Sequence, residues 1–473
     1  MRIALLKPPI GGILGLEMLT FVEPLGLEYL VGALEPDGHD CLVLDLRIDG
    51  EDAGLEACRR HDPDLVGIQC NFTTERNRAM RVARRVRGLL PEAFILLGGH
   101  DASRSPEWFL QPPVDAVAIG DGESVLPELV RPLEDGRPLG SVPGMAFRDG
   151  DEVRETAPAE RIDDLDELPL PARASVSRYA DRYYINYRKP LALLETARGC
   201  PYRCTFCSVW QFHGTRFRYK SPERVVQELA AIDAPNVFIT DDIFWLDADR
   251  GWEMARQIQA AGIRKYFTVQ TRTDLICRHP DLVEAWKGCG DLAIFLGVEK
   301  VDDEGLRALN KRSRADANVR ALEILKEIGV GFTSNFIVDP DWQSEDFARL
   351  KAWLRVMGAY NSGFSVLTPL PGTLLWNDVK DEVTTDDWEM FDIVHTVLPT
   401  RLPLEEFYRE YADLWAETLR VRYAERGRAR TWLQLAAALA TGKVSPGAIR
   451  KGMNIARVFS DPETFLAGHR RPA

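Results

Sequence analysis

The first 145 residues alternate between short apolar runs and longer stretches in which apolar residues recur at helical spacing. The apolar runs are 2–6, 41–46, 65–70, 94–97 and 116–119, and the helical stretches include 27–34, 76–90 and 124–133. Short apolar runs bounded by turn residues are typical of strands buried on both faces. The alternation therefore predicts a doubly wound, Rossmann-like α/β domain over residues 1–145.

A second alternation follows an acidic, proline-containing linker at residues 146–188. Its predicted strands are 191–196, 237–239, 268–270, 293–298, 331–337 and 363–367, with helices such as 223–230 and 315–328 between them. Six β/α repeats predict a partial (β/α)6 barrel over residues 189–384, smaller than the eightfold barrel. From 385 to 473 the pattern becomes mostly helical, with clear stretches at 404–420 and 431–440.

Both folds place ligands at the carboxyl ends of their parallel strands. In the first domain this rule selects the loops 7–23, 69–74, 98–103 and 120–123 as candidate ligand-binding segments. In the barrel it selects the loops that follow each strand, and the most unusual of these comes directly after the first strand.

Charge narrows the classes of partner. The net charge is −13, and from Arg420 to the end 11 Lys/Arg stand against 3 Asp/Glu, so the tail carries +8 and the remainder −21. The acidic body disfavours nucleic acid as a partner. A basic tail suits an anionic lipid surface or the acidic body itself. No signal peptide and no apolar stretch of about 20 residues is evident, so we expect a cytoplasmic protein, at most peripheral to a membrane.

Three of the eight cysteines are clustered. Cys200, Cys204 and Cys207 show C-x3-C-x2-C spacing in a loop with glycine and proline. Iron–sulfur clusters usually have four cysteine ligands, so three thiolates leave one iron of a [4Fe–4S] cluster open to another ligand. Structural zinc needs four ligands, with His213 the one nearby candidate, and a disulfide is disfavoured inside the cell.

With Phe206 just before its third cysteine, this loop resembles the signature of the radical S-adenosylmethionine superfamily. The resemblance implies that the methionine amine and carboxylate chelate the open iron. It also implies that reduction by one electron, supplied by a flavodoxin- or ferredoxin-type donor, releases a 5′-deoxyadenosyl radical. The cofactor then does the difficult chemistry, while the protein positions it and excludes water.

Four further residues match places where this superfamily holds S-adenosylmethionine. Asp241 and Asp242 follow the second barrel strand and suit the methionine ammonium, with a helix N-cap as the alternative. Arg272 follows the third strand and suits a carboxylate, or else pairs with Asp274. Glu299 ends the fourth strand and suits the ribose hydroxyls, or else pairs with Lys300 or Lys311. The turn at 368–373 suits the adenine or the substrate.

The loops of the first domain resemble those of cobalamin-binding domains found before radical enzymes. The residues that carry this expectation are Gln69, Asn71, Phe72, Gly98, Gly99, His100, Ser103, Gly120 and Glu123. Glycines there let the backbone approach a large planar ligand. The chain lacks D-x-H-x-x-G, so the resemblance implies base-off cobalamin without a histidine ligand, with His100 at the corrin edge. The alternative is a nucleotide-binding or vestigial α/β domain.

Across nearly its whole length the chain resembles the hopanoid C-3 methylases. The segments that carry this resemblance are 23–28, 198–201, 221–226, 262–265, 339–342, 395–404 and 469–472. The resemblance implies methylation of an unactivated carbon of a small molecule, for example a terpenoid, lipid or natural product. Methylcobalamin would supply the methyl group and the 5′-deoxyadenosyl radical would activate the carbon.

Other functions fit parts of the pattern. The same frame supports a cobalamin-dependent cyclisation, ring contraction or oxidation, which product mass would separate from methylation. A non-catalytic cobalamin or iron–sulfur sensor has no need of an open iron. A transfer-RNA methylthiotransferase fits poorly with the acidic body and the lack of a basic RNA-binding module.

Overall fold

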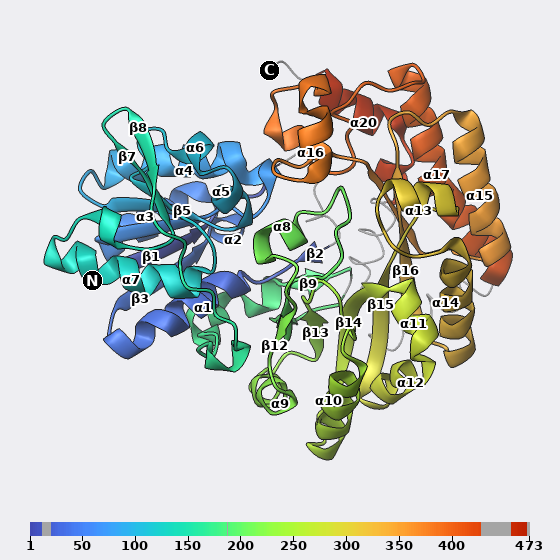
Figure 1. Ribbon diagram of the computed structural model, residues 1–473, viewed down its shortest axis with the longest axis horizontal. Coiled ribbons are helices and arrows are strands. Elements are labelled where there is room, and N and C mark those ends of the chain that lie inside the picture. The colour runs from blue at the N-terminus through green and yellow to red at the C-terminus, as the bar shows by residue number, and fades with distance from the viewer. Residues whose placement is uncertain (12–19, 187, 427–455, 471–473) are drawn as a thin grey trace.

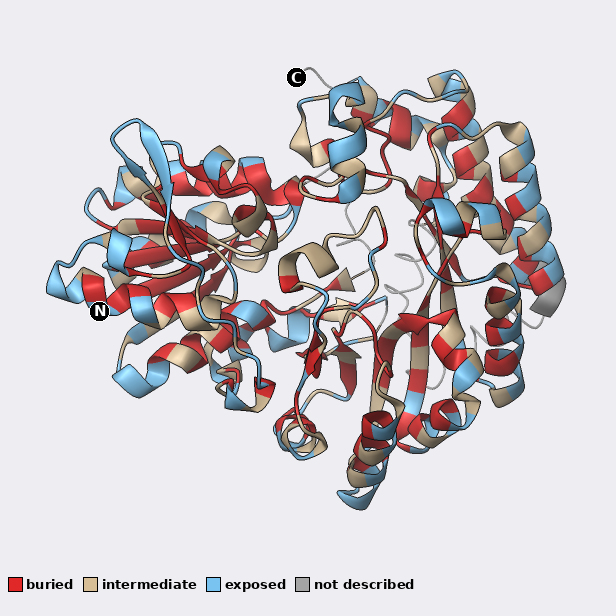
Figure 2. Ribbon diagram, viewed as in Figure 1, coloured by how far each residue is buried: buried red, intermediate tan, exposed pale blue. Residues whose placement is uncertain are grey.

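The computed structural model describes residues 1–11, 20–186, 188–426 and 456–470. Two α/β units lie side by side, and the C-terminal helices cover the top and outer side of the second unit (Figure 1). The strands at the centre of each unit are buried, while the outward faces of the helices are exposed (Figure 2). This arrangement confirms the predicted fold class.

The first sheet has the order β3-β1-β4-β5-β6-β7-β8. Its parallel strands are β3 (Asp40–Asp45), β1 (Arg2–Lys7), β4 (Leu65–Gln69), β5 (Phe94–Gly98) and β6 (Ala116–Ala118). Each coincides with a predicted apolar run to within two residues at either end. Their carboxyl ends meet at one edge of the sheet, where the candidate loops begin.

Two layers of helices cover this sheet because its strands present alternate side chains to opposite faces. Leu6 packs with α3 (Glu51–His61) and α4 (Arg76–Leu89) on one face. Leu5 packs with α1 (Leu25–Leu34) and α7 (Gly122–Asp135) on the other. Strands that are apolar on both faces predict a sheet covered by helices on both sides, as is found here.

The expected domain boundary at 145 needs correction. Strands β7 (Met145–Asp149) and β8 (Glu152–Glu155) form an antiparallel hairpin that pairs with β6, so the first sheet continues to Glu155. The described residues of the rest of the expected linker pack against the first domain and pair with it. It contains the 3₁₀ helix η6 (Arg173–Arg182), and β9 (Tyr184–Ile185) pairs with β2 (Thr20–Phe21).

The second sheet has six parallel strands in sequence order, as predicted. They are β10 (Leu191–Leu194), β13 (Asn236–Ile239), β14 (Lys265–Arg272), β15 (Gly290–Glu299), β16 (Gly331–Val338) and β17 (Ser362–Val366). The helices between them include α9 (Pro222–Ala230), α10 (Ala248–Ala260), α12 (Pro280–Gly288), α14 (Ala315–Ile328) and α15 (Ser344–Met357). β10 and β17 do not pair, so the barrel stays open.

The C-terminal region is less helical than its pattern indicates. Residues 391–403 contain no helix, and Val366 of β17 donates a backbone hydrogen bond to Ile393 at 2.6 Å. Helix α17 (Leu404–Arg426) extends the predicted stretch and packs on α15, with α20 (Pro462–His469) against it. The predicted stretch 431–440 lies outside the described residues. None of the described helices is both long and apolar enough to cross a membrane.

The two units share a hydrophobic core. The cluster that holds Leu5 and Val31 of the first domain also includes Leu191, and Phe238 and Phe295 of the barrel pack against it. At the far side, Trp388 belongs to the segment after the barrel. The guanidinium of Arg76 lies over its indole ring, 4.3 Å from the ring centroid. The first domain is therefore held both by the barrel and by the segment before α17, beside which it lies in Figure 1.

Candidate cofactor sites

The cysteine loop begins where barrel strand β10 has ended. β11 (Ala197–Arg198) pairs antiparallel with β12 (Arg218–Tyr219), and Gly199 then turns the chain with a φ of +94°. A Cβ on Gly199 would lie 2.3 Å from the carbonyl oxygen of Arg216. Only glycine combines this dihedral angle with so close an approach of two backbones.

Three hydrogen bonds to the backbone of the loop fix its position. Thr205 donates to the carbonyl of Leu309 at 3.1 Å, and Leu375 donates to the carbonyl of Thr205 at 3.0 Å. The indole of Trp210, in the short helix α8 (Val209–His213), donates to the carbonyl of Cys204 at 3.0 Å. The backbone that carries the three cysteines is thus fixed by hydrogen bonds to neighbouring segments, without a disulfide between the cysteines.

The three thiols suit a multinuclear cluster. Burial raises the pKa of Cys200 and Cys204, and raises that of Cys207 to about 12, and Cys204 raises the pKa of Cys200 and Cys207 further. A bound cationic metal would favour the thiolate form of all three. In the described residues no three His, Cys, Asp or Glu side chains converge as a single ion requires. In a [4Fe–4S] cluster each cysteine binds a different iron, so three thiols on one loop suit three of its four irons.

Asp241 and Asp242 both reach toward this loop. Asp241 is fully buried, and its carboxylate accepts hydrogen bonds from the amide of Thr196 at 2.6 Å, the amide of Ala197 at 2.9 Å and the Thr196 hydroxyl at 2.5 Å. It therefore anchors the chain between β10 and the cysteines. Asp242 accepts a bond from the amide of Gly199 at 3.2 Å. Burial raises the pKa of Asp241 to about 6 and that of Asp242 to about 7. Their contact with S-adenosylmethionine stays a prediction.

Arg272 and Glu299 each have a partner within the chain. The guanidinium of Arg272 lies 3.7 Å from the ring centroid of Tyr202 in the cysteine loop, and its Nε donates to Asp274 at 2.8 Å. Glu299 pairs with Lys311 at 2.8 Å. Phe206 is half-buried beside Cys207. The two charged residues lie at the carboxyl ends of β14 and β15, so binding S-adenosylmethionine would add to these ion pairs.

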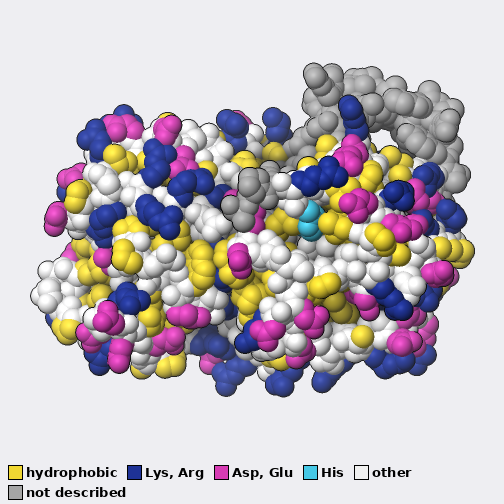
Figure 3. Space-filling model, turned by 90° about the horizontal axis from the view of Figure 1, so that it is seen from above, with side chains coloured by type: hydrophobic (Ala, Val, Ile, Leu, Met, Phe, Trp, Pro, Cys, Tyr) yellow, Lys and Arg dark blue, Asp and Glu magenta, His cyan; other side chains and the backbone are white. Residues whose placement is uncertain are grey.

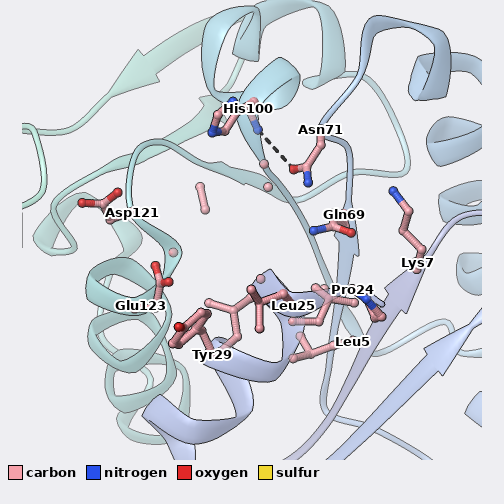
Figure 4. Close-up of a pocket in the computed structure, with 18 of the residues that line it drawn as sticks. Leu5, Lys7, Pro24, Leu25, Tyr29, Gln69, Asn71, His100, Asp121 and Glu123 are labelled. Atoms are coloured by element: carbon pink, nitrogen blue, oxygen red, sulfur yellow. Dashed lines mark hydrogen bonds between the residues drawn. The ribbon is translucent and has the colours of Figure 1, made fainter. Parts of the chain in front are cut away.

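A cavity of about 440 Å³ opens at the carboxyl ends of β1, β4, β5 and β6 (Figure 4). Eight of the nine residues predicted to hold cobalamin line it: Gln69, Asn71, Phe72, Gly98, Gly99, His100, Gly120 and Glu123. Ser103 does not. Its hydroxyl donates to the carbonyl of Ala118 at 3.2 Å and accepts from the amide of Gly120 at 3.3 Å. Ser103 therefore stabilises the loop at Gly120 without lining the cavity itself.

Several lining residues escaped the sequence prediction. Lys7 and Tyr29 line the cavity from the first domain, and Leu193, Glu195 and Arg198 line it from the barrel side. Lys7 pairs with buried Glu75. Lys7 falls in a loop that the strand-end rule selected. Phe212 and His213 also line the cavity, and their place just after the cysteine loop is a signal for such a role. Leu193, Glu195 and Arg198 carried no signal, because no local pattern tells which side chains will face a second domain.

His100 connects the cavity to the cysteine side. Its amide donates to Asn71 Oδ1 at 3.4 Å (Figure 4), while its ring stacks on Phe212 of α8 with centroids 3.8 Å apart. Burial, then the nearby Arg104 and Arg198, lowers the pKa of His100 to about 4. The imidazole is therefore neutral at physiological pH, in keeping with its expected place at the corrin edge.

Acid should weaken the apoprotein through His213. Burial, followed by His100, lowers the pKa of His213 to about 3, and its Nδ1 accepts a bond from Arg218 at 3.4 Å. Below pH 6.5 this histidine is protonated in the unfolded chain, whereas in the folded protein it stays neutral down to a pH of about 3. We expect unfolding free energy to fall with acid, and His213→Gln to reduce this dependence by about 1.4 kcal/mol per pH unit. Urea unfolding between pH 6.5 and 4.5 measures this, and equal slopes for both proteins would contradict it.

Gly99→Ala should damage the cavity. Gly99 has a φ of +114°, and a Cβ there would lie 2.4 Å from Asn71 Oδ1 and 2.6 Å from the carbonyl oxygen of Cys70. We expect a loss of about 1–3 kcal/mol from the backbone alone, together with weaker binding of hydroxocobalamin in a spectroscopic titration. Gly136→Ala is the control, because its φ of +67° is also positive but no atom lies within 4 Å of the added Cβ. Unchanged cobalamin affinity in Gly99→Ala would remove this loop from the binding site.

Together, a three-cysteine loop at the mouth of an open six-stranded barrel and a glycine-lined cavity in a doubly wound domain define a radical S-adenosylmethionine enzyme with a cobalamin-binding domain. Comparisons with known proteins agree. Residues 11–130 match the B12 binding domain family and residues 194–354 match the radical SAM superfamily. The solved structure of OxsB with aqua-cobalamin and S-adenosylmethionine superposes with a TM-score of 0.71 at 16% identity, over 99% of this chain and 78% of that one.

A second solved structure, of TsrM from Kitasatospora setae with tryptophan and aza-SAM, covers 80% of this chain and 76% of that chain with a TM-score of 0.64 and 20% identity. In sequence, the chain is 36% identical to the hopanoid C-3 methylase of Methylococcus capsulatus over 463 residues, which cover 95% of this chain and 86% of that protein. The chain belongs to the cobalamin-dependent radical S-adenosylmethionine methylase family. Its cofactors are a [4Fe–4S] cluster, S-adenosylmethionine and cobalamin.

Proposed function

We propose that this enzyme methylates an unactivated carbon of a hydrophobic small molecule of the hopanoid class. When bound, the cluster with S-adenosylmethionine supplies a hydrogen-abstracting radical, and cobalamin supplies the methyl group. The substrate class rests on the similarity to the hopanoid C-3 methylase, which extends through both domains and the helical end.

One observation carries the proposed reaction: the cobalamin cavity and the cysteine loop meet at the same domain interface. His100 from the cavity stacks on Phe212, which follows the cysteines. Arg198, two residues before Cys200, donates to Glu123 of the cavity loop at 2.6 Å. A reaction in which two cofactors act on one carbon needs both held around a single site with fixed orientation.

The chain's own residues then position the cofactors and keep water from the interface. We propose that S-adenosylmethionine is contacted by Asp241, Asp242, Arg272 and Glu299, and that the eight lining residues named above contact cobalamin, whose lower face has no histidine ligand. Hydrogen abstraction by a radical needs no general base, so we assign no side chain that role.

We further propose a flavodoxin- or ferredoxin-type electron donor and a cytoplasmic location. No disulfide joins any of the eight cysteines, which suits a reducing compartment. A hydrophobic substrate has to arrive from a membrane or a carrier, and the basic C-terminal segment suits contact with anionic lipid. On the face seen in Figure 3, acidic and basic side chains are interspersed over both halves of the molecule, unlike a nucleic-acid-binding surface.

The test is anaerobic turnover of reconstituted full-length protein with reductant, hydroxocobalamin, a hopanoid in micelles and S-adenosylmethionine deuterated in its methyl group. We expect 5′-deoxyadenosine and a product heavier by the deuterated methyl group. 5′-Deoxyadenosine with a product of altered mass but no added methyl would instead indicate cyclisation or oxidation. No 5′-deoxyadenosine at all would overturn the proposed reaction.

A further inference from the structure

Arg104 is a half-buried cation that forms no ion pair within the described part of the chain. It ends α5 (His100–Arg104), the short helix that follows the cavity loop of β5. Its Nε and Nη2 are shielded from solvent and have no hydrogen-bond partner. Burial lowers its pKa. Buried guanidinium groups are almost always paired, so two unpartnered N–H groups indicate a missing acceptor.

The nearest carboxylate of the same helix is already engaged. Asp101 accepts from Arg76 Nε at 2.5 Å and Nη2 at 3.1 Å, and from the Thr73 hydroxyl at 2.8 Å. Arg76 is itself a cation near Arg104 and lowers the pKa of Arg104 further. Asp101 favours the charged form of Arg104 from a distance, but the described residues of the first domain supply no carboxylate that accepts a hydrogen bond from this guanidinium.

The guanidinium points across the domain interface toward the cysteine loop. A Cβ on Gly372, in the turn after β17, would lie 2.8 Å from Arg104 Nη2 and 2.9 Å from Nε, so the guanidinium packs directly against the backbone of this turn of the second unit. Three residues on, Leu375 donates to the carbonyl of Thr205 in the cysteine loop. Cys207 is within electrostatic reach, because its thiolate favours the charged form of Arg104.

We propose that Arg104 is the cation that the cobalamin-binding domain presents to the [4Fe–4S] cluster, donating its N–H groups to sulfur and raising the cluster's reduction potential. Three thiolates leave the cluster anionic, which gives the buried guanidinium its counter-charge. Net charge and hydrogen bonds to the sulfurs are among the factors that set the potentials of such clusters. The first domain thereby tunes the reducibility of a cluster bound by the barrel. This inference rests on the cluster and is independent of the substrate.

The test is a redox titration of anaerobically reconstituted full-length protein, followed by electron paramagnetic resonance of the reduced cluster. At a fixed potential near the wild-type midpoint we expect R104Q to show an about tenfold lower ratio of reduced to oxidised cluster, a shift of about 59 mV for one electron. R104M, which also removes the donors, should shift at least as far in the same direction. R104K keeps the charge and should stay closer to wild type.

R131Q is the matched control, since Arg131 lies in the same domain with its side chain 55% exposed and paired with Glu128. Iron content and cobalamin binding show that each variant is folded and loaded. An R104Q midpoint equal to that of wild type overturns the inference, and if turnover is nevertheless lost, Arg104 binds substrate instead. A shifted midpoint with no methylation of the hopanoid would support the role of Arg104 while contradicting the proposed substrate.

Discussion

Cys204→Ala is expected to reduce 5′-deoxyadenosine formation to background while leaving the fold intact. The thiol is one of three cluster ligands, and its loss leaves two irons without a cysteine instead of one. The backbone should persist, because Trp210 bonds the carbonyl of Cys204 and not its sulfur. Iron and sulfide content, the paramagnetic signal of the reduced cluster and 5′-deoxyadenosine from S-adenosylmethionine measure the effect.

Cys41→Ala is the control for this substitution. Cys41 is a half-buried cysteine of β3 in the first sheet, so the same chemical change occurs far from the loop. It should retain cluster content and S-adenosylmethionine cleavage. If Cys204→Ala kept full cleavage activity, the cluster assignment would be wrong and a non-catalytic role of the loop would gain support.

Arg198→Met is expected to cost about 3–5 kcal/mol of stability, because it leaves the shielded carboxylate of Glu123 without its cation, while Asp121 keeps its ion pair with Arg218. Arg198 is 6% exposed and donates to Glu123 at 2.6 Å, Glu195 at 2.9 Å and Asp121 at 3.4 Å. These anions raise its pKa well above the ordinary value, against the effect of burial. Two of the carboxylates belong to the first domain, so their repulsion should also open the interface and weaken cobalamin binding.

Denaturant unfolding and a hydroxocobalamin titration measure these two effects. Arg59→Met removes an exposed pair with Glu56 on α3 and should leave stability nearly unchanged, because exposed ion pairs contribute little. A small effect of Arg198→Met, comparable to that of Arg59→Met, would mean that the interface does not depend on this ion-pair network.

The sequence predicted the features that depend on local pattern. Short apolar runs located eleven parallel strands, and glycine-containing loops after the strands of the first sheet located the cavity. The β7–β8 hairpin was missed although Asp149-Gly150 is a strong turn signal, because the acidic residues around it suggested a linker. Cysteine spacing located the cluster loop without help from tertiary structure.

Roles that depend on distant contacts could not be predicted in this way. Asp241 follows a strand as a ligand-binding residue should, yet its carboxylate turns back onto Thr196 and Ala197. Ser103 supports a neighbouring loop and does not line the cavity. Arg198 and Arg104 look like ordinary surface arginines, and only the packing of two domains shows that one balances three carboxylates and the other has no partner.

The shared core has a consequence for how this protein can be altered. Leu5 and Val31 of the first domain lie in one cluster with Leu191, against which Phe238 and Phe295 pack. A first domain cut from this chain would expose an apolar surface that it normally covers, and would tend to aggregate. The two domains are therefore not interchangeable modules: a chimera with another barrel must carry over the matching apolar side chains as well as the cofactor loops.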